Sequence, residues 1–112
     1  MTFGSGKRER FRPHYVLEEL KAKIAAGEHY ATKRVGAVLS RHGWDESDIE
    51  DCVANLTSSD FFKSQAHTKR DGVWLDIYKP TYEGERLYVK FVIDEDGCTI
   101  VVLDFCEDGE IH

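Results

Sequence analysis

Alternation of apolar and polar residues marks the second half of the chain. Residues 73–79 and 86–93 alternate almost without a break, and residues 98–105 form a third, more apolar run. A period of two is typical of strands with one buried face. The segments between these runs are short, acidic and contain glycine, as turns between neighbouring antiparallel strands do. Together with residues 60–64, the pattern predicts a four-stranded antiparallel meander.

The two alternating runs predict a sheet with two unlike faces. One face collects apolar side chains, and we expect it to build the core: Val73, Leu75, Ile77, Leu87, Val89, Phe91 and Ile93. The other face carries aromatic and charged side chains: Trp74, Asp76, Tyr78, Arg86, Tyr88 and Lys90. An ordinary solvated strand face would carry Thr, Ser or Glu instead. Asp76 is expected to pair with Lys90 or Arg86 on a neighbouring strand.

The first half of the chain predicts three helices. Pro13, Thr32 and Asp45 are residues that start helices, and Gly27 and Gly43 are residues that end them. Apolar residues at helical spacing follow each start: Val16, Leu17, Leu20 and Ile24, then Val35, Val38 and Leu39, then Ile49, Cys52, Val53 and Leu56.

Helices followed by strands predict an α+β fold, with three N-terminal helices packed on one face of a four-stranded, mainly antiparallel sheet. Residues 29–31 are a short connection that could form a brief edge strand.

The chain of 112 residues is expected to form one domain over residues 1–112. No apolar run approaches the roughly 20 residues that span a bilayer, and residues 1–13 do not resemble a secretory signal. We therefore expect a cytoplasmic protein.

The charges are divided unevenly along the chain. Residues 1–44 contain nine Lys or Arg and four Asp or Glu, whereas residues 45–112 contain six and seventeen. An acidic balance disfavours nonspecific nucleic-acid binding, so any site for anions must be local. Residues 7–12 form a basic cluster that could contribute to such a site, but the favoured expectation is that residues 1–12 are a flexible basic tail.

The three cysteines, Cys52, Cys98 and Cys106, are an odd number without a C-x-x-C pair. This pattern favours buried thiols over disulfides or a zinc site. The acidic turn at residues 94–96 lacks the rest of a calcium-binding loop. No metal or other cofactor is expected.

Three segments carry a resemblance to a known family. Residues 60–64 read DFFKS, residues 74–80 read WLDIYKP, and residues 87–90 read LYVK. At this spacing they resemble the MqsR toxins, the motility quorum-sensing regulators of bacterial type II toxin–antitoxin systems. The resemblance covers about residues 12–105. It implies a RelE-like α+β fold, cleavage of messenger RNA without the ribosome, and neutralisation by an antitoxin with a DNA-binding domain.

The resemblance also implies site residues. The family's active-site lysine falls on Lys63, and its active-site tyrosine falls on Tyr88. Two positions depart from the family pattern, because a glutamine is replaced by Leu75 and a lysine by Cys106. The second change removes a cation from the expected phosphate site, and residues 107–110 place negatively charged side chains nearby.

Metal-independent RNA cleavage needs activation of the 2′-hydroxyl, stabilisation of phosphate charge and protonation of the leaving oxygen. Lys63 and Tyr88 are the predicted catalytic residues. Further residues are predicted to bind RNA: Lys90, Tyr78, Lys79, Arg86 and His67. His67 could act as a base or acid, but the favoured interpretation is a histidine in a surface loop. Tyr78 could stack on an unpaired base or pack in the sheet, and for Trp74 packing is favoured.

Two functions remain open from the sequence. The first is a toxin that cleaves single-stranded mRNA as a metal-independent endoribonuclease. The second is a toxin-fold protein with weakened catalysis that acts by binding an antitoxin or as a regulatory module. In both cases the expected protein partner is a cognate antitoxin with a helix-turn-helix DNA-binding domain.

Overall fold

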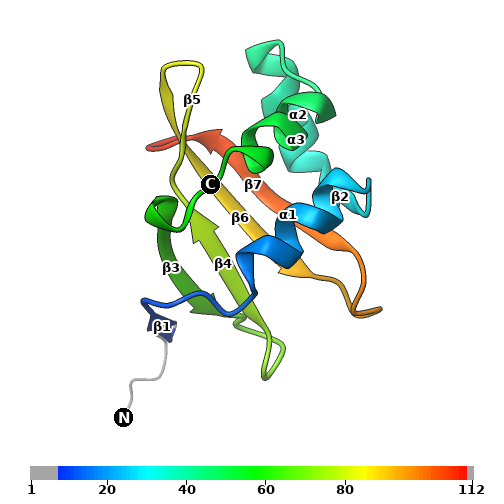
Figure 1. Cartoon of the computed structure of the whole chain (residues 1–112), viewed down its shortest axis with the longest axis vertical. Helices are drawn as coiled ribbons and strands as arrows, with labels where there is room; N and C mark the ends of the chain where they lie inside the picture. Colours follow the sequence, from blue (N-terminus) through cyan, green and yellow to red (C-terminus); the bar gives the residue numbers. More distant parts are fainter. Residues whose placement is uncertain (1–7, 111–112) are drawn as a thin grey trace.

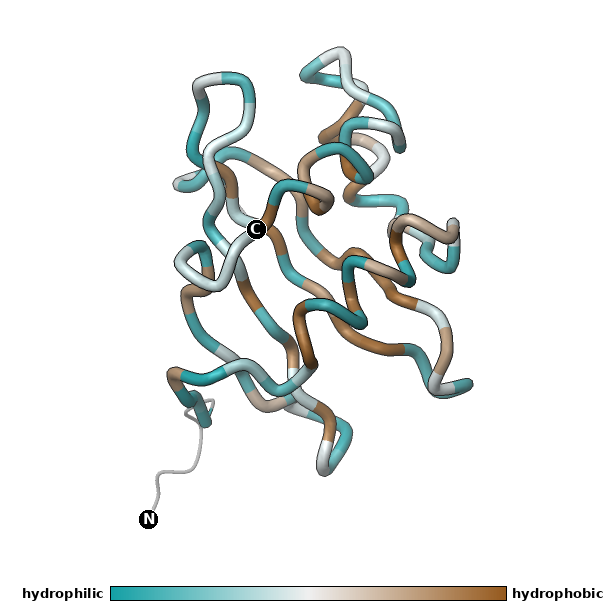
Figure 2. Tube along the Cα trace, viewed as in Figure 1, coloured by the Kyte–Doolittle hydropathy of each residue, from teal (hydrophilic) through white to brown (hydrophobic). Residues whose placement is uncertain are grey.

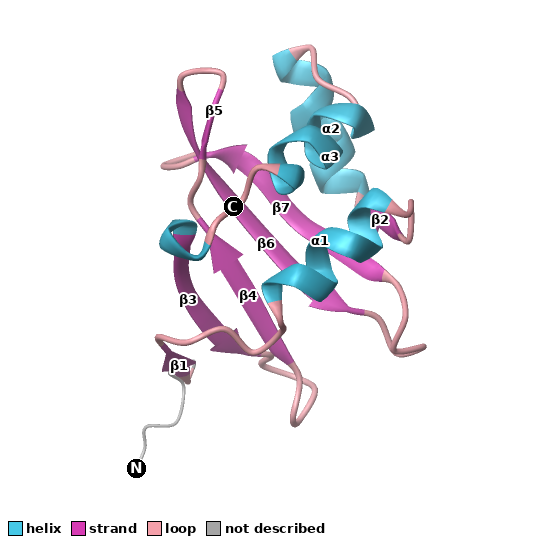
Figure 3. Ribbon diagram, in the orientation of Figure 1, coloured by secondary structure: helices cyan, strands magenta, loops and turns pink. Residues whose placement is uncertain are grey.

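The computed structural model describes residues 8–110. Three helices precede the long strands: α1 (Leu17–Ala25), α2 (Lys33–His42) and α3 (Glu46–Ala54). A 3₁₀ turn, η1 (Ser58–Asp60), leads into the strands. The strands are β1 (Glu9–Arg10), β2 (His29–Ala31), β3 (Phe61–Ala66), β4 (Trp74–Tyr78), β5 (Thr81–Tyr82), β6 (Glu85–Ile93) and β7 (Ile100–Glu107). The α+β class is therefore confirmed (Figure 3).

The predicted meander forms the centre of the sheet. Strands β3, β4, β6 and β7 are neighbours in that order, and each pair is antiparallel. The expected strand number of four is wrong, because residues 8–110 already form a sheet of seven strands. Strand β1 pairs with β3 at one edge, β2 runs parallel to β7 at the other, and β5 pairs with β6. Strands of two or three residues are too short to show a period of two.

The main core lies between the helices and one face of the sheet (Figures 1 and 2). Apolar residues of α1, α2 and α3 pack there against Leu87, Val89 and Phe91 of β6 and Val102 and Phe105 of β7. A smaller cluster on the opposite face of the sheet contains Val38, Ile77, Tyr88 and Cys106. We call that opposite side the open face. It is the side on which Lys63, Ile77 and Lys90 are cross-strand neighbours.

The expected core face is right for β6 and wrong for β4. Tyr78 is only 1% exposed and lies in the main core, whereas Ile77 belongs to the cluster on the open face. Register explains the difference, because Tyr78 pairs with Val89 and Ile77 pairs with Lys90. Residues directly opposite one another in a sheet point to the same face. Alternation alone shows that a strand has two faces but does not show which one meets the helices.

The first helix starts later than expected, at Leu17 rather than Pro13. The carboxylate of Asp76 explains the delay, because it accepts hydrogen bonds from the backbone N–H groups of His14 and Tyr15. Asp76 is fully buried and also accepts a hydrogen bond from the hydroxyl of Ser64. The expected pairing of Asp76 with Lys90 or Arg86 is therefore wrong. Asp76 instead fixes the segment before α1 against the sheet.

Two other expectations need correction. Residues 1–7 of the expected flexible tail lie outside the described residues, but Glu9 and Arg10 form β1 and pair with Gln65 and Ser64 of β3. Cys52 and Cys106 are buried as expected, whereas Cys98 is exposed.

Among the described residues, no helix is long and apolar enough to cross a membrane.

Candidate active site on the open sheet face

A β-bulge places Lys63 on the open face. Phe61 pairs with Tyr78 and Lys63 pairs with Ile77, so that an extra residue, Phe62, is inserted between them. In a regular strand Phe61 and Lys63 would point to the same face. Because of the bulge, Phe61 packs on Tyr78 in the core while Lys63 points to the opposite side. Bulges commonly re-aim a side chain next to a functional site.

The register of the next strands brings Lys90 and Tyr88 to the same face. Ile77 separates Lys63 from Lys90, and Tyr88 lies two residues before Lys90 on β6. At the usual strand spacing, the backbones of Lys63 and Lys90 are about 10 Å apart. The ammonium of Lys90 lies 5.7 Å from the centre of the Tyr88 ring. The two predicted catalytic residues and one predicted RNA-binding residue therefore share one surface.

Burial sets the protonation state of Tyr88. Its side chain packs with Val38, Ile77 and Cys106, and the residue is 7% exposed. Burial and then the nearby Asp104 carboxylate raise the pKa of Tyr88 to about 12. Tyr88 is consequently a neutral hydroxyl near pH 7, which can donate a proton or a hydrogen bond but cannot serve as a base.

Each of the three lysines on the open face has a carboxylate partner. The ammonium of Lys63 lies 2.6 Å from Glu9, that of Lys79 lies 3.3 Å from Asp108, and that of Lys90 lies 3.4 Å from Asp104. The carboxylate of Asp104 also contacts the guanidinium of Arg34. The lysines are half-buried rather than extended into solvent. An RNA phosphate bound here must compete with these carboxylates.

The position at which the resemblance implied a lysine holds a neutral thiol. Cys106 lies opposite Tyr88 on β7, and its Sγ is 3.9 Å from the backbone oxygen of Tyr88. Burial and then the Asp104 carboxylate raise the pKa of Cys106 to about 12. The thiol therefore carries no charge near neutral pH, and it cannot replace the missing cation.

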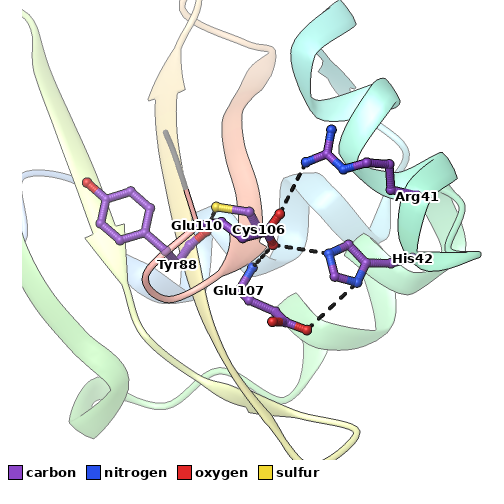
Figure 4. A network of polar contacts seen from close by, with 6 residues as sticks. All are labelled: Arg41, His42, Tyr88, Cys106, Glu107 and Glu110. Atoms are coloured by element: carbon purple, nitrogen blue, oxygen red, sulfur yellow. Dashed lines mark hydrogen bonds and ion pairs between the residues drawn. The ribbon is translucent and has the colours of Figure 1, made fainter.

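Helix α2 anchors the chain that follows Cys106 (Figure 4). The carboxylate of Glu110 accepts hydrogen bonds from Arg41 at 3.1 Å and from the ring of His42 at 3.0 Å. It also accepts one from the backbone N–H of Glu107. This network fixes the turn at residues 107–110, whose Asp108 is the partner of Lys79.

Phe62 is a site feature that the sequence did not single out. Its ring is 39% exposed. The ammonium of Lys79 lies 3.9 Å and that of Lys63 5.1 Å from the ring centre. An exposed ring beside two cations can stack on an unpaired base while the cations meet the phosphates. The bulge could have been suspected only from the unusual Phe61–Phe62 pair before a polar residue.

The remaining predicted site residues are dispersed. Arg86 is exposed at the start of β6, on the same face as Tyr88, so it extends the surface at one end. His67 lies in the β3–β4 connection, where its Nδ1 accepts a hydrogen bond from the backbone of Lys69. It follows Lys63 by four positions, which is about 13 Å in the direction away from Tyr88. Tyr78 does not reach the surface at all, because its ring lies between Phe61 and Phe91.

Within residues 8–110, no group of three or more His, Cys, Asp or Glu side chains is arranged to hold a metal ion. The site on the described residues therefore consists of cations, carboxylates, one tyrosine and one exposed aromatic ring.

Comparison with known proteins agrees with the motifs on which this site is built. The family described as "Motility quorum-sensing regulator, toxin of MqsA" matches residues 12–107. A curated relative, the "mRNA interferase toxin MqsR" of Escherichia coli (strain K12), is 25% identical over 99 residues. That alignment covers 88% of this chain and 98% of the relative. The family match covers most of the chain, and the chain belongs to the MqsR toxin family.

Proposed function

We propose that this toxin is a metal-independent endoribonuclease that cleaves single-stranded mRNA on the open face of its sheet. The observation that carries the proposal is the bulge at Phe62, which turns Lys63 out of the core and onto the surface shared by Tyr88 and Lys90. The Escherichia coli relative is named an mRNA interferase, and this name supports the same activity.

The reaction that fits these groups uses the RNA's own 2′-hydroxyl as nucleophile. Its oxygen loses its proton to water and forms a bond to phosphorus, the bond from phosphorus to the 5′-oxygen breaks, and the products are a 2′,3′-cyclic phosphate and a 5′-hydroxyl. Lys63 and Lys90 stabilise the negative charge that develops on the phosphate oxygens. Tyr88, protonated because its pKa is raised to about 12, donates the proton that the departing 5′-oxygen needs.

Substrate binding follows from the surroundings of Lys63. Phe62 offers a stacking surface for one base, and Lys79 and Arg86 extend the positive surface toward neighbouring phosphates. Single-stranded RNA suits this arrangement, because the bases of a duplex are already stacked and cannot reach an isolated ring.

The carboxylates favour a second candidate function. Each lysine that RNA would need already forms an ion pair with a carboxylate, from Glu9, Asp108 or Asp104. In addition, two positions at which the resemblance implied polar residues hold Leu75 and Cys106. A toxin scaffold with weak catalysis would act through its protein partner. For either function we infer a cognate antitoxin, with a helix-turn-helix DNA-binding domain, encoded next to this protein.

Cleavage of a single-stranded RNA in EDTA separates the two functions. We expect cleavage by the wild type and a loss of roughly 10²- to 10³-fold in Lys63→Ala, the usual scale for one preorganised charge-stabilising donor. Lys69→Ala is the matched control, because Lys69 is exposed in the β3–β4 connection. If the wild type does not cleave RNA but binds its antitoxin tightly, the binding function replaces the enzymatic one.

A further inference from the structure

We propose that Gln65 is a further RNA-binding residue of this site, and that its side-chain oxygen accepts a hydrogen bond from a ribose 2′-hydroxyl. The inference rests on the proposed function, because it places a substrate contact beside Lys63. Its basis is the amide oxygen of Gln65, which is buried on the open face of the sheet and lacks a hydrogen-bond partner.

Gln65 lies two residues after Lys63 on β3 and points to the same face. Two strand residues correspond to about 7 Å along the strand. A phosphate held by Lys63 therefore places a neighbouring ribose within reach of the Gln65 side chain. The two residues also share a partner, since the Glu9 carboxylate lies 2.6 Å from the Lys63 ammonium and 3.4 Å from the amide nitrogen of Gln65.

The bond to Glu9 fixes which end of the amide is available. A carboxylate only accepts hydrogen bonds when ionised, so the amide nitrogen must face Glu9. The amide oxygen of Gln65 is then left buried without a hydrogen-bond partner, in a residue that is only 7% exposed. Buried acceptors are costly to leave unsatisfied, and each one in a folded protein calls for an explanation.

A small cavity lies beside the Gln65 residue. It has a volume of about 80 Å³ and is lined by Gln65, Ala66, His67, Thr68 and Leu75. Because the nitrogen is directed at Glu9, the oxygen is the amide atom that remains for a ligand, and the ligand must displace the groups that now bury this oxygen. The ligand must bring a donor. The 2′-hydroxyl is the donor that every nucleotide of RNA carries and that DNA lacks.

Register adds a second argument. Gln65 and Leu75 are direct cross-strand partners on the open face. The resemblance of the sequence to the MqsR toxins implied a glutamine at position 75, and this chain has leucine there. Side chains of such a pair have their Cβ atoms only about 5 Å apart. An amide that is missing from β4 is thus present on the adjacent position of β3.

The test exchanges the two residues. Variants Gln65→Leu, Leu75→Gln and the double exchange are compared with the wild type for cleavage of single-stranded RNA. Lys69→Ala, exposed in the β3–β4 connection, is the control. We expect Gln65→Leu to slow cleavage by about 2- to 10-fold, the size of one neutral hydrogen bond, and the double exchange to recover most of the loss. Thermal unfolding checks that the variants fold.

A binding measurement makes the result independent of catalysis. RNA with 2′-amino groups keeps a donor, RNA with 2′-fluoro groups has none, and neither carries the attacking hydroxyl. We expect the wild type to prefer the 2′-amino RNA by about 2- to 10-fold, and Gln65→Leu to lose this preference. An unchanged preference in Gln65→Leu overturns the proposal. If the wild type shows the preference but cleaves no RNA, the proposed nuclease function fails while the role of Gln65 stands.

Discussion

Lys63 and Glu9 are 54 residues apart in the chain, yet the ammonium of Lys63 lies 2.6 Å from the carboxylate of Glu9. The contact exists because β1 pairs with β3 and places Glu9 opposite Gln65. Strand β1 precedes the region matched by the family, which begins at residue 12. The proposed phosphate-binding cation is therefore neutralised by a short strand at the start of the chain.

Removing this negative charge should strengthen RNA binding. In Glu9→Gln, an amide replaces the carboxylate and Lys63 no longer has to exchange one anion for another. We expect RNA to bind about two- to fivefold more tightly at low salt, because partly exposed ion pairs contribute 0.2–1 kcal/mol. Binding of a labelled single-stranded RNA at several salt concentrations measures the effect.

The matched control is Glu85→Gln, which removes the same charge from an exposed position at the start of β6. Both variants change the net charge equally, so a general electrostatic effect would appear in both. If the two variants bind RNA equally, the contact between Lys63 and Glu9 has no specific influence on the site.

Tyr88 should make the protein less stable at high pH. Burial, followed by the Asp104 charge, raises the pKa of Tyr88 from its ordinary value of 10.0 to about 12. The folded protein thus holds this proton more tightly than the unfolded chain does. The stabilisation is complete below pH 10 and is lost as the pH rises through about 12. In Tyr88→Phe, the free energy of unfolding should fall less steeply over this range.

Urea unfolding at several alkaline pH values tests the Tyr88 prediction. The slope in Tyr88→Phe should not disappear, since burial also raises the pKa of Tyr78 to about 12. Identical slopes in the wild type and Tyr88→Phe would show that Tyr88 is not protonated more strongly in the folded state.

Local pattern was sufficient to predict the long strands and the existence of the helices. The alternation in β6 correctly assigned Leu87, Val89 and Phe91 to the core. The same reasoning failed for β4, where Tyr78 faces the core and Ile77 does not. Both faces of β4 carry large apolar side chains, and only pairing with β6 determines which one meets the helices. Register is a tertiary property and leaves no local signal.

The site was predictable to a similar extent. Motif resemblance selected Lys63 and Tyr88, and the structure brings both to one face. The motifs do not include Glu9. Strand β1 has only two residues, so no alternating pattern indicates that it pairs with β3 and brings Glu9 to the site. Gln65, the proposed ribose contact, was within reach of sequence reasoning, since it alternates with Lys63. It was missed because the strand was expected to end at residue 64.

Asp76 should be among the most stabilising polar residues in the chain. It is fully buried and accepts hydrogen bonds from the backbone N–H groups of His14 and Tyr15 and from the Ser64 hydroxyl. Asp76→Ala leaves these partly or fully buried donors without an acceptor, and we expect a loss of roughly 3–5 kcal/mol. Asp76→Asn retains one oxygen and should cost less. Denaturant unfolding of both variants measures the losses, and an unchanged midpoint in Asp76→Ala would contradict the role assigned to this carboxylate.

Cys106 offers the most direct way to strengthen the site. It lies opposite Tyr88 on β7, and its thiol is neutral because burial and then the Asp104 charge raise its pKa to about 12. In Cys106→Lys, the long side chain can extend past the rim of the small cluster and place its ammonium beside Tyr88. We expect RNA cleavage to rise roughly tenfold, since one preorganised donor is worth up to 10²–10³ in rate. The salt dependence of binding should steepen by about 0.7 in its logarithmic slope, the value of one additional phosphate contact to a single strand.

Cys106→Met separates charge from packing in this experiment, because methionine has a comparable length and no charge. If Cys106→Met raises cleavage as much as Cys106→Lys, the gain comes from packing around Tyr88 and not from a restored cation. The nearby carboxylates of Asp104, Asp108 and Glu110 are close enough to influence the thiol, and they would also attract a new ammonium. For that reason the assay should include Cys106→Lys combined with Asp108→Asn, in which one competing carboxylate is removed. Cleavage that is absent in the wild type, in Cys106→Lys and in this double variant, together with tight antitoxin binding, would mean that the open face serves the partner and not RNA cleavage.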